Sequence, residues 1–329
     1  MSAARIACLL GPTGTGKTGT VAAMAALADT ASPLPIAVVN FDSRQVYRDF
    51  PIITAQPTPE ERAVCPHLLY GFLETDRTIT AAAFTDMAHE AIVKVAAMGR
   101  LPVLVGGTGL YLKALLQGLA PIPDVPADIH EATVAEVREK GAPALHRDLA
   151  AVDPVTAERL HPNDTQRIAR ALEVFRASGH PLSHWHTLEH PKADYDALKL
   201  GIRLDLDELT PKLAARIDEM LAMGAVDEAR RALEICPDPE APGWTGIGCA
   251  ELGAYLRGDI DLERARYLWT RNTRAYAKRQ ITWCRKERGM HWFAPGEPER
   301  VAAFVRAWME GGPLPESDAT DGGEGGGAE

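Results

Sequence analysis

A glycine-rich loop near the start of the chain has the residues that bind phosphate groups. The stretch Gly11-Pro12-Thr13-Gly14-Thr15-Gly16-Lys17-Thr18 fits the pattern G-x-x-x-x-G-K-[ST]. Glycines let backbone N–H groups close around an anion, and the start of a following helix adds partial positive charge. We expect Lys17 to reach the terminal phosphates and the Thr18 hydroxyl to bind Mg²⁺. The loop predicts a di- or triphosphate ligand, against the alternative of an ordinary tight turn, but it does not identify the reaction.

Two further polar stretches come directly after apolar runs. Asp42 follows the run Ile36–Phe41, and it could be a Mg²⁺ ligand, a general base or the N-cap of a helix. The stretch Gly106-Gly107-Thr108-Gly109 follows the run Leu101–Val105. It could place a hydroxyl in the site or be a plain turn.

Two stretches combine cations in a way that suits nucleic acid. Gln166-Arg167-Ile168-Ala169-Arg170 puts its polar side chains on neighbouring helix positions, as an RNA contact or as a solvated face with ion pairs. From Tyr276 to Arg285, aromatic residues alternate with lysine and arginine residues. Lys278, Thr282 and Arg285 share one helix face. Such a surface suits loop RNA, and the alternative is a helix whose aromatic residues pack on the core.

Four histidines, His180, His184, His186 and His190, lie within one short segment. No carboxylate or cysteine completes a metal-ligand set with them, so we interpret the segment as a polar connection between elements rather than a metal site.

Apolar runs alternating with helical patterns predict the elements that position these residues. Strands are expected at Ile6–Leu10, Ile36–Phe41 and Leu101–Val105, with helices at Gly19–Ala28 and Thr80–Met98. This order predicts an α/β fold with a parallel sheet covered by helices on both faces. Ligands bind at the carboxyl ends of such strands, where Gly11–Thr18, Asp42 and Thr108 all fall.

The second half of the chain begins with a helical insertion. Three prolines in Pro121–Pro126 mark its start, residues 128–178 look helical, and Asp164 is a plausible N-cap. We then expect a strand and three helices, and a last strand at His291–Phe293. The strand is Leu198–Leu206, and the helices are Thr210–Met223, Val226–Leu233 and Leu262–Glu287. The predicted parts are a core at 1–123, an all-helical insertion at 124–195, a second core part at 196–310 and a disordered acidic tail at 311–329.

Composition narrows the function classes. The chain has 329 residues, of which 46% are hydrophobic and 24% charged, and no apolar run approaches the roughly 20 residues that span a bilayer. Its five cysteines are scattered without a C-x-x-C pair, which favours a reducing cytoplasm. The formal net charge is −10, yet lysine and arginine residues dominate the segment 271–288. A local basic surface that binds RNA is therefore compatible with an acidic protein.

Taken in order, the motifs resemble those of the tRNA dimethylallyltransferases, also called tRNA isopentenyltransferases, of bacterial type. The resemblance covers residues 5 to about 295. Besides the glycine-rich loop, it rests on Asp42–Arg48, Pro66-His67-Leu68, Val105–Tyr111, His161–Asp164, Gln166–Val174, Thr245–Gly248 and Tyr276–Arg285. The resemblance implies a P-loop NTPase-like sheet and transfer of a dimethylallyl group from its diphosphate to RNA.

The implied acceptor is the exocyclic amine of the adenosine 3′ of the anticodon, in tRNAs that read codons beginning with U. The resemblance makes Asp42 the base that removes the amine proton and places Thr108 beside the reacting centre. Lys17, the amides of residues 14–18 and a Mg²⁺ ion on Thr18 would stabilise the leaving diphosphate. Arg216, or Lys212 one turn earlier, would clamp that diphosphate, and we favour Arg216.

The resemblance also implies contacts with the anticodon stem-loop. Ser43, Arg44 and Gln45 would line the pocket of the target base, which must leave its stack to enter. His130 stands where the family commonly has an arginine, and Gln56 replaces a lysine. The further contacts implied are Gln166, Arg167, Ile168, Ala169, Arg170, Thr245, Gly246, Ile247, Gly248, Cys249, Lys278, Arg279, Gln280, Ile281, Thr282, Trp283, Cys284 and Arg285.

Two other functions were weighed. A P-loop kinase of small molecules or nucleotides would explain Lys17, Thr18 and Asp42, but would leave the basic aromatic segment at 276–285 without a purpose. A non-catalytic RNA-binding protein with a vestigial loop predicts that Asp42→Ala has no effect. We expect a cytoplasmic monomer that needs no ATP, although its loop is of the ATP-binding kind.

Overall fold

The computed structural model describes residues 3–26, 35–189 and 193–318. The chain divides into two compact units, one made of Met1–Leu116 with Asp194–Glu329 and one made of Gln117–Ala193. Among the described residues, no helix is long and apolar enough to cross a membrane. Predictions for residues 27–28, His190 and the acidic tail from 319 onward lie outside the described residues.

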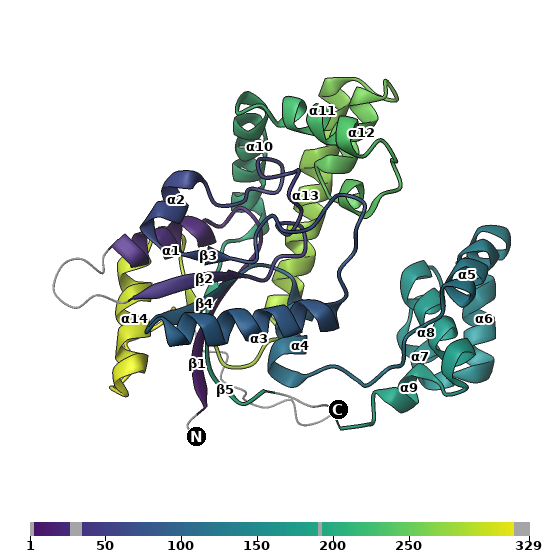
Figure 1. Cartoon of the computed structure of the whole chain (residues 1–329), viewed down its shortest axis with the longest axis horizontal. Helices are drawn as coiled ribbons and strands as arrows, with labels where there is room; N and C mark the ends of the chain where they lie inside the picture. The colour runs from purple at the N-terminus through teal and green to yellow at the C-terminus, as the bar shows by residue number, and fades with distance from the viewer. Residues whose placement is uncertain (1–2, 27–34, 190–192, 319–329) are drawn as a thin grey trace. The chain divides into compact units, whose positions relative to one another are not determined.

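The first unit is built on one six-stranded sheet in the order β3-β2-β4-β1-β5-β6 (Figure 1). All its strand pairs are parallel, with Cys8 of β1 opposite Leu104 of β4 and Lys199 of β5. The fold class predicted from the sequence is therefore confirmed. The strands are β1 (Ala4–Leu10), β2 (Ile36–Asn40), β3 (His67–Leu68), β4 (Leu101–Val105), β5 (Tyr195–Ile202) and β6 (Met290–Phe293).

Helices cover both faces of this sheet because alternate residues of each strand point to opposite sides. Ile6, Cys8 and Leu10 of β1 join the core that contains Phe84 of α3 (Ala81–Ala97). Their neighbours in β1 join the other core, together with α1 (Lys17–Ala26) and α14 (Pro298–Glu310). The central strands are buried on both faces, as their continuous apolar sequence predicts.

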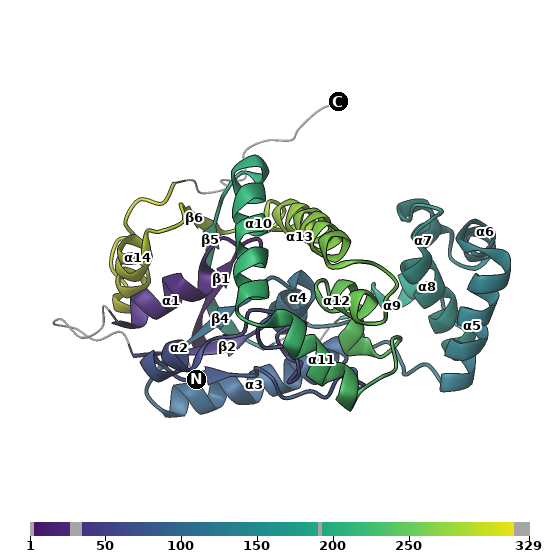
Figure 2. The ribbon, with the colours of Figure 1, turned by 90° about the horizontal axis from the view of Figure 1, so that it is seen from above.

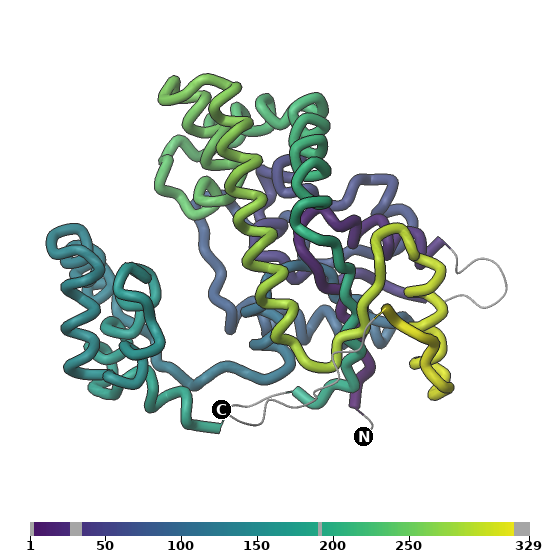
Figure 3. The backbone as a smooth tube through the Cα atoms, turned by 180° about the vertical axis from the view of Figure 1, so that it is seen from behind, coloured from purple at the N-terminus to yellow at the C-terminus, as the bar shows by residue number. Residues whose placement is uncertain are grey.

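Between β5 and β6, the chain of this unit forms a group of helices. The long helix α13 (Leu262–Cys284) packs against α10 (Leu206–Ala222) and α12 (Cys249–Leu256), as Figures 2 and 3 show. Asp261 caps α13 by accepting a hydrogen bond from the backbone N–H of Arg264. The remaining elements of this unit are α2 (Pro59–Val64), α4 (Gly109–Gln117), α11 (Ala225–Ile235) and the 3₁₀ turn η2 (Pro242–Thr245).

The second unit is wholly helical. Leu145, Leu149, Ile168 and Leu172 form its core. Asp164 caps one helix through the N–H of Arg167, and Gly179 ends that helix in the left-handed conformation, as expected from the sequence. Its helices are α5 (Ala127–Lys140), α6 (Ala142–Val152), α7 (Pro154–Arg159), α8 (Thr165–Ser178) and α9 (Leu182–Trp185).

Some boundaries differ from the prediction. The strand expected at Leu198–Leu206 is β5, which ends at Ile202 because α10 already begins at Leu206. Helix α1 begins at Lys17 rather than Gly19, since the last residues of the glycine-rich loop form its first turn. No helix follows Asp42, so the interpretation of Asp42 as a helix N-cap is wrong; a turn follows instead.

Candidate active site

The glycine-rich loop connects β1 to α1 and is held by its own hydrogen bonds. Lys17 Nζ donates to the carbonyl oxygens of Gly11 and Pro12, each at 2.9 Å. The Thr15 hydroxyl donates to Pro12 O, also at 2.9 Å. Gly14 has a φ of +84°, and a Cβ there would lie 2.6 Å from Leu213 Cδ2 of α10, so only glycine lets the loop pack on that helix.

A cavity of about 340 Å³, the P-loop cavity, opens at the mouth of this loop. Arg216 of α10 enters it and donates to the Thr13 hydroxyl at 3.3 Å, while Lys212 lines it from an exposed position. Both predicted clamps of a diphosphate thus lie at the loop. The P-loop cavity is lined by Thr13, Gly14, Gly16, Lys17, Thr18, Gly19, Asp42, Gln45, Thr54, Val105, Gly106, Lys212, Arg216 and Glu219.

A second cavity of about 340 Å³, the α13 cavity, shares part of its wall with the first. Thr13, Asp42, Thr54 and Arg216 line both. The α13 cavity is otherwise lined by Ser43, Arg44, Ile53, Ala55, Leu213, Ile217, Met220, Thr245, Ile247, Trp269, Thr273, Tyr276 and Arg279. Asp42 therefore lies where a polar, cationic cavity meets one with aromatic and aliphatic walls.

The Asp42 side chain is oriented by local hydrogen bonds. The buried Asn40 accepts from Asp42 N at 2.8 Å and donates to Leu69 O at 2.8 Å. Asp42 Oδ1 in turn accepts from Arg44 N at 2.9 Å, which closes a turn. The Arg44 guanidinium donates to the hydroxyl of Thr245 at 3.1 Å, so two segments predicted to act together meet at one wall.

The glycines after β4 allow this strand end to approach Asp42. A Cβ on Gly106 would lie 2.6 Å from the carbonyl carbon of Phe41 and 2.8 Å from Asp42 N. The next residues bring Thr108 to the same place, where its hydroxyl accepts from Ser43 N at 3.0 Å and donates to the Ser43 hydroxyl at 3.3 Å. The stretch is therefore a close-approach turn, whereas Thr108 itself lines neither cavity and its role beside the reacting centre stays a prediction.

Burial and charge shift two pKa values here. Burial lowers the pKa of Lys17 to about 8, a change that the nearby Asp42 carboxylate opposes and Arg216 reinforces. Burial also raises the pKa of the Tyr276 hydroxyl, and the negative charge of Asp42 adds to that rise. Tyr276 is therefore neutral at physiological pH and able to donate a hydrogen bond.

Helix α13 presents two faces that the sequence did not separate. On the inner face, the buried Gln280 accepts from Thr13 N at 2.8 Å and donates to Gly107 O at 3.1 Å. On the outer face, Lys278, Arg279, Thr282 and Arg285 are exposed, and Arg279 lies over the Tyr276 ring at 5.5 Å. Ile281 and Trp283 lie between the faces and are half-buried.

Burial corrects part of the predicted tRNA contacts. Gln280, Cys284, Cys249 and Ile168 are each less than 5% exposed, and their side chains pack within the protein. They cannot contact RNA directly in this conformation. Gly246 and Gly248 are also buried, whereas Thr245 and Ile247 line the α13 cavity.

The predicted contacts of the helical unit lie on α8 and α5. Gln166, Arg167 and Arg170 are exposed on α8 and line a cavity of about 420 Å³ together with Arg159, while Ala169 is half-buried. Arg167 pairs with Asp164 at 2.9 Å, so part of this face is an ion-paired surface. His130 lies on α5 and bonds to Glu173 at 2.8 Å.

Sequence reasoning missed the residues that hold the loop between β2 and α2. Glu228 of α11 accepts from the backbone N–H groups of Ile52 and Ile53 at 2.7 and 2.9 Å. Gln45, which the resemblance places in the pocket of the target base, lines the P-loop cavity instead and donates to the carbonyl oxygens of Thr54 and Ala55. These bonds position Thr54 at both cavities. Gln56 donates to Tyr47 O at 2.7 Å and is thus used within the protein.

Few side chains of the described residues are arranged to bind a metal ion. No group of three or more His, Cys, Asp or Glu side chains forms a metal site within the described part of the chain. His180 and His184 stack at 4.9 Å between ring centroids, as parts of a polar connection. At the P-loop cavity, the Thr18 hydroxyl and the Asp42 carboxylate are oxygen donors that suit Mg²⁺ when substrate oxygens complete the set.

Comparison with known proteins identifies the family of the chain. The model of the IPP transferase family matches residues 45–287. A tRNA dimethylallyltransferase of Maridesulfovibrio salexigens is 57% identical over 304 residues, covering 92% of this chain and 97% of the relative. The full-length tRNA isopentenylpyrophosphate transferase of Bacillus halodurans has a solved structure that is 31% identical, with a TM-score of 0.67 and coverage of 94% of this chain and 97% of that one.

A eukaryotic dimethylallyltransferase acting on tRNA has the same fold. Its structure gives a TM-score of 0.78 at 24% identity, and the match covers 95% of this chain and 81% of that one. At that identity the likeness concerns the fold alone. The family match and the bacterial relatives confirm the resemblance seen in the motifs: the chain belongs to the IPP transferase family.

Proposed function

We propose that this protein transfers a dimethylallyl group from dimethylallyl diphosphate to the exocyclic amine of the adenosine 3′ of the anticodon, in tRNAs that read codons beginning with U. One observation carries the proposal: the P-loop cavity and the α13 cavity meet at Asp42. Two adjoining cavities with a carboxylate between them suit a reaction of two substrates in which one loses a proton to a base.

The donor diphosphate binds in the P-loop cavity. The backbone N–H groups at the start of α1 would donate to the diphosphate in this cavity. The partly buried cations Lys17 and Arg216 would neutralise the charge of the diphosphate. These groups stabilise the leaving diphosphate more strongly than the bound ester, because negative charge on the bridging oxygen grows as the bond to carbon breaks. Arg216 clamps the diphosphate, and Lys212 adds charge from the rim.

Mg²⁺ is proposed as the partner of the diphosphate. The Thr18 hydroxyl would hold the ion, and diphosphate oxygens and water would fill its other positions. When bound, the ion supplies positive charge that stabilises the departing diphosphate.

Asp42 acts as the base. The C–O bond between the allylic carbon and the diphosphate breaks, the amine nitrogen forms its bond to that carbon, and the amine proton moves to the Asp42 carboxylate. An adenine amine is a weak nucleophile, so removing its proton as the bond forms lowers the barrier. Asp42 Oδ1 accepts a hydrogen bond from the backbone N–H of Arg44, so Asp42 Oδ2 is the oxygen that would accept the amine proton. Thr108 and Tyr276 supply hydroxyl groups beside this centre.

The acceptor base enters the α13 cavity. The half-buried Ile247 and Tyr276 supply surfaces for an unstacked base, and Arg44 and Ser43 line the wall next to Asp42. The outer face of α13 binds the backbone of the anticodon stem-loop through Lys278, Arg279 and Arg285. Gln166, Arg167 and Arg170 of α8 are a second contact for the tRNA. A monomeric state and a cytoplasmic location stay predictions.

Transfer of label from dimethylallyl diphosphate to unmodified tRNA, with Mg²⁺ and without ATP, tests the proposal. Incorporation at the adenosine 3′ of the anticodon is the expected result. A P-loop kinase is the second candidate, favoured only by the loop itself. It predicts no incorporation into RNA and turnover of ATP on a small acceptor, an outcome that would overturn the transferase proposal.

A further inference from the structure

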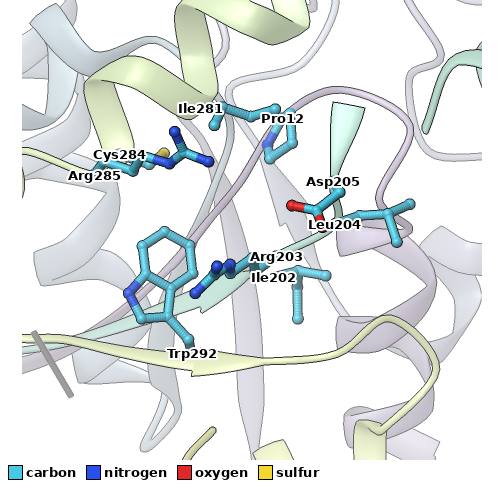
Figure 4. A pocket seen from close by; sticks show the side chains of 9 residues that line it. All are labelled: Pro12, Ile202, Arg203, Leu204, Asp205, Ile281, Cys284, Arg285 and Trp292. Carbon is cyan, nitrogen blue, oxygen red and sulfur yellow. The ribbon is translucent and has the colours of Figure 1, made fainter. Parts of the chain in front are cut away.

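A third cavity of about 310 Å³, the β5–α13 pocket, lies on the core unit and shares only Pro12 with the glycine-rich loop. Of its lining residues, the proposed function uses only Arg285, as a contact for the RNA backbone. Figure 4 shows its lining, in which Arg285 and Asp205 extend into the pocket from opposite sides. The lining residues are Pro12, Ile202, Arg203, Leu204, Asp205, Ile281, Cys284, Arg285 and Trp292.

Two cations of this pocket are unpaired. Arg203 and Arg285 are exposed, and neither forms a side-chain hydrogen bond or ion pair with any described residue. This contrasts with Arg266 and Arg300, which pair with carboxylates on the same unit. Unpaired guanidinium groups beside one cavity leave several N–H donors free for an anion, and a phosphate oxygen matches their geometry.

The remaining lining adds an acceptor and an apolar wall. Asp205 precedes α10 but makes no capping hydrogen bond with its side chain, so the carboxylate remains available. The ring of Trp292 lies on the β5 backbone, where a Cβ on Gly201 would be 2.4 Å from it. The ring is buried except for an edge that leaves Trp292 6% exposed, and this edge and the half-buried Ile281 form a small apolar wall against which a flat ring can pack.

We propose that the β5–α13 pocket binds one nucleotide unit of the RNA acceptor. Arg203 and Arg285 bind its phosphate, Asp205 accepts a hydrogen bond from its ribose hydroxyl or base N–H, and the base packs on the wall of Trp292 and Ile281. Donors for a phosphate, an acceptor and an apolar face together match a nucleotide better than an inorganic anion.

A free nucleotide has the same chemistry, but the position of the pocket favours RNA. Arg285 directly follows α13 and shares a face with Lys278, which is also exposed and unpaired among the described residues. RNA that follows the outer face of α13 would therefore reach the pocket. This inference rests on the proposed tRNA acceptor, but its test measures binding, so failure of transfer and failure of the pocket are distinguishable.

The test compares Arg203→Gln with Arg77→Gln, which changes an exposed arginine that lines none of the cavities described above. Binding of an anticodon stem-loop RNA to the full chain is measured over a range of salt concentrations, and dimethylallyl diphosphate binding is measured alongside. We expect Arg203→Gln to weaken RNA binding about 5- to 10-fold and to lower the salt slope by about 1. Arg77→Gln should match the unmodified protein, and both variants should bind dimethylallyl diphosphate normally.

Asp205→Ala and Asp205→Asn together distinguish a nucleotide from a bare phosphate, because asparagine keeps an oxygen acceptor and alanine does not. If the carboxylate accepts from ribose or base, Asp205→Ala binds RNA more weakly than Asp205→Asn; if it merely repels phosphate, both variants bind RNA more tightly and to the same extent. Equal tightening in both variants would overturn the nucleotide assignment. If RNA binding is unchanged in Arg203→Gln while AMP binding is lost, the occupant is a free nucleotide and the RNA assignment is wrong. If neither ligand depends on Arg203, the site itself is wrong.

Discussion

Gln280 accepts a hydrogen bond from the backbone N–H of Thr13 at 2.8 Å, which ties α13 to the phosphate-binding loop. The same amide donates to Gly107 O, next to Thr108. One buried side chain thus connects the helix proposed to bind RNA with the two loops proposed to bind the donor and to carry the reacting groups. We infer that Gln280 is a positioning residue, because its buried amide bonds to backbone groups of Thr13 and Gly107.

Gln280→Met keeps the volume of the side chain and removes both hydrogen bonds. Two half-buried backbone groups lose their partner, so we expect a loss of about 1 kcal/mol in the free energy of unfolding. Dimethylallyl diphosphate should bind more weakly, with little change in the affinity for tRNA, as titration of each substrate would measure. Gln280→Glu, which keeps the acceptor for Thr13, should recover part of the donor affinity. Loss of tRNA affinity alone would instead make Gln280 an RNA contact.

The pKa of Lys17 predicts how donor binding depends on pH. Because burial lowers this pKa to about 8, Lys17 of the free protein loses its charge as pH rises through 8. The Kd for dimethylallyl diphosphate should increase above that pH, by up to about ten-fold per pH unit. Lys17→Arg keeps its charge and should give a flatter profile, even if binding is weaker throughout. Calorimetric titration between pH 6.5 and 9.5 measures the Kd of the unmodified protein and of Lys17→Arg. If the Kd values of the two proteins change with pH in parallel, Lys17 is not the group that titrates.

The lowered pKa of Lys17 makes the stability of the ligand-free protein increase with pH, whereas donor binding weakens. A lysine whose pKa is lower in the folded than in the unfolded protein makes its charged form a cost to folding below pH 8. That cost is relieved as pH rises from 8 toward the ordinary value of 10.5. Lys17→Met should therefore stabilise the protein without ligand at pH 7, which thermal unfolding would show.

Gly106→Ala tests the close approach of β4 to Asp42. The new Cβ would meet backbone atoms of Phe41 and Asp42, which cannot rotate away as a side chain could. We expect a loss of stability of about 1–3 kcal/mol, as for overpacking, and a fall in kcat because Asp42 shifts. Gly312→Ala is the control, since its nearest neighbour would be 3.7 Å away. Equal kcat values in both variants would show that the approach does not position Asp42.

Lys278→Ala combined with Arg285→Ala tests the outer face of α13. Each residue is exposed and unpaired among the described residues, so their removal should hardly change stability. If both contact RNA phosphates, tRNA binding weakens and the slope of log K against log salt falls by about 2. Filter binding at several salt concentrations measures the slope, and an unchanged slope removes this face from the RNA interface.

The sequence predicts those parts of the site that depend on local patterns and on sheet topology. The loop at Gly11–Thr18 needs only a strand before it and a helix after it. Because the carboxyl ends of parallel strands share one edge, the meeting of Asp42 and Thr108 could also be expected. Local periodicity likewise predicts α13 and its exposed cations Lys278 and Arg285.

Contacts between distant segments could not be predicted in this way. Gln280 looked like one more polar residue of a basic helix, because its partners Thr13 and Gly107 are far away in the sequence. Glu228 gave no signal either, since its partners are backbone groups of Ile52 and Ile53. Strand β3 has only two residues, too few to produce an alternating pattern.

The central claim is that Asp42 takes the amine proton where the two cavities meet. Asp42→Asn keeps the shape of the side chain and its acceptor for Arg44 N but removes the basic oxygen. In single-turnover transfer of labelled dimethylallyl groups to tRNA, we expect the rate to fall about 100-fold or more, with both substrates bound about as tightly as before. A transfer rate near that of the unmodified protein would contradict the account.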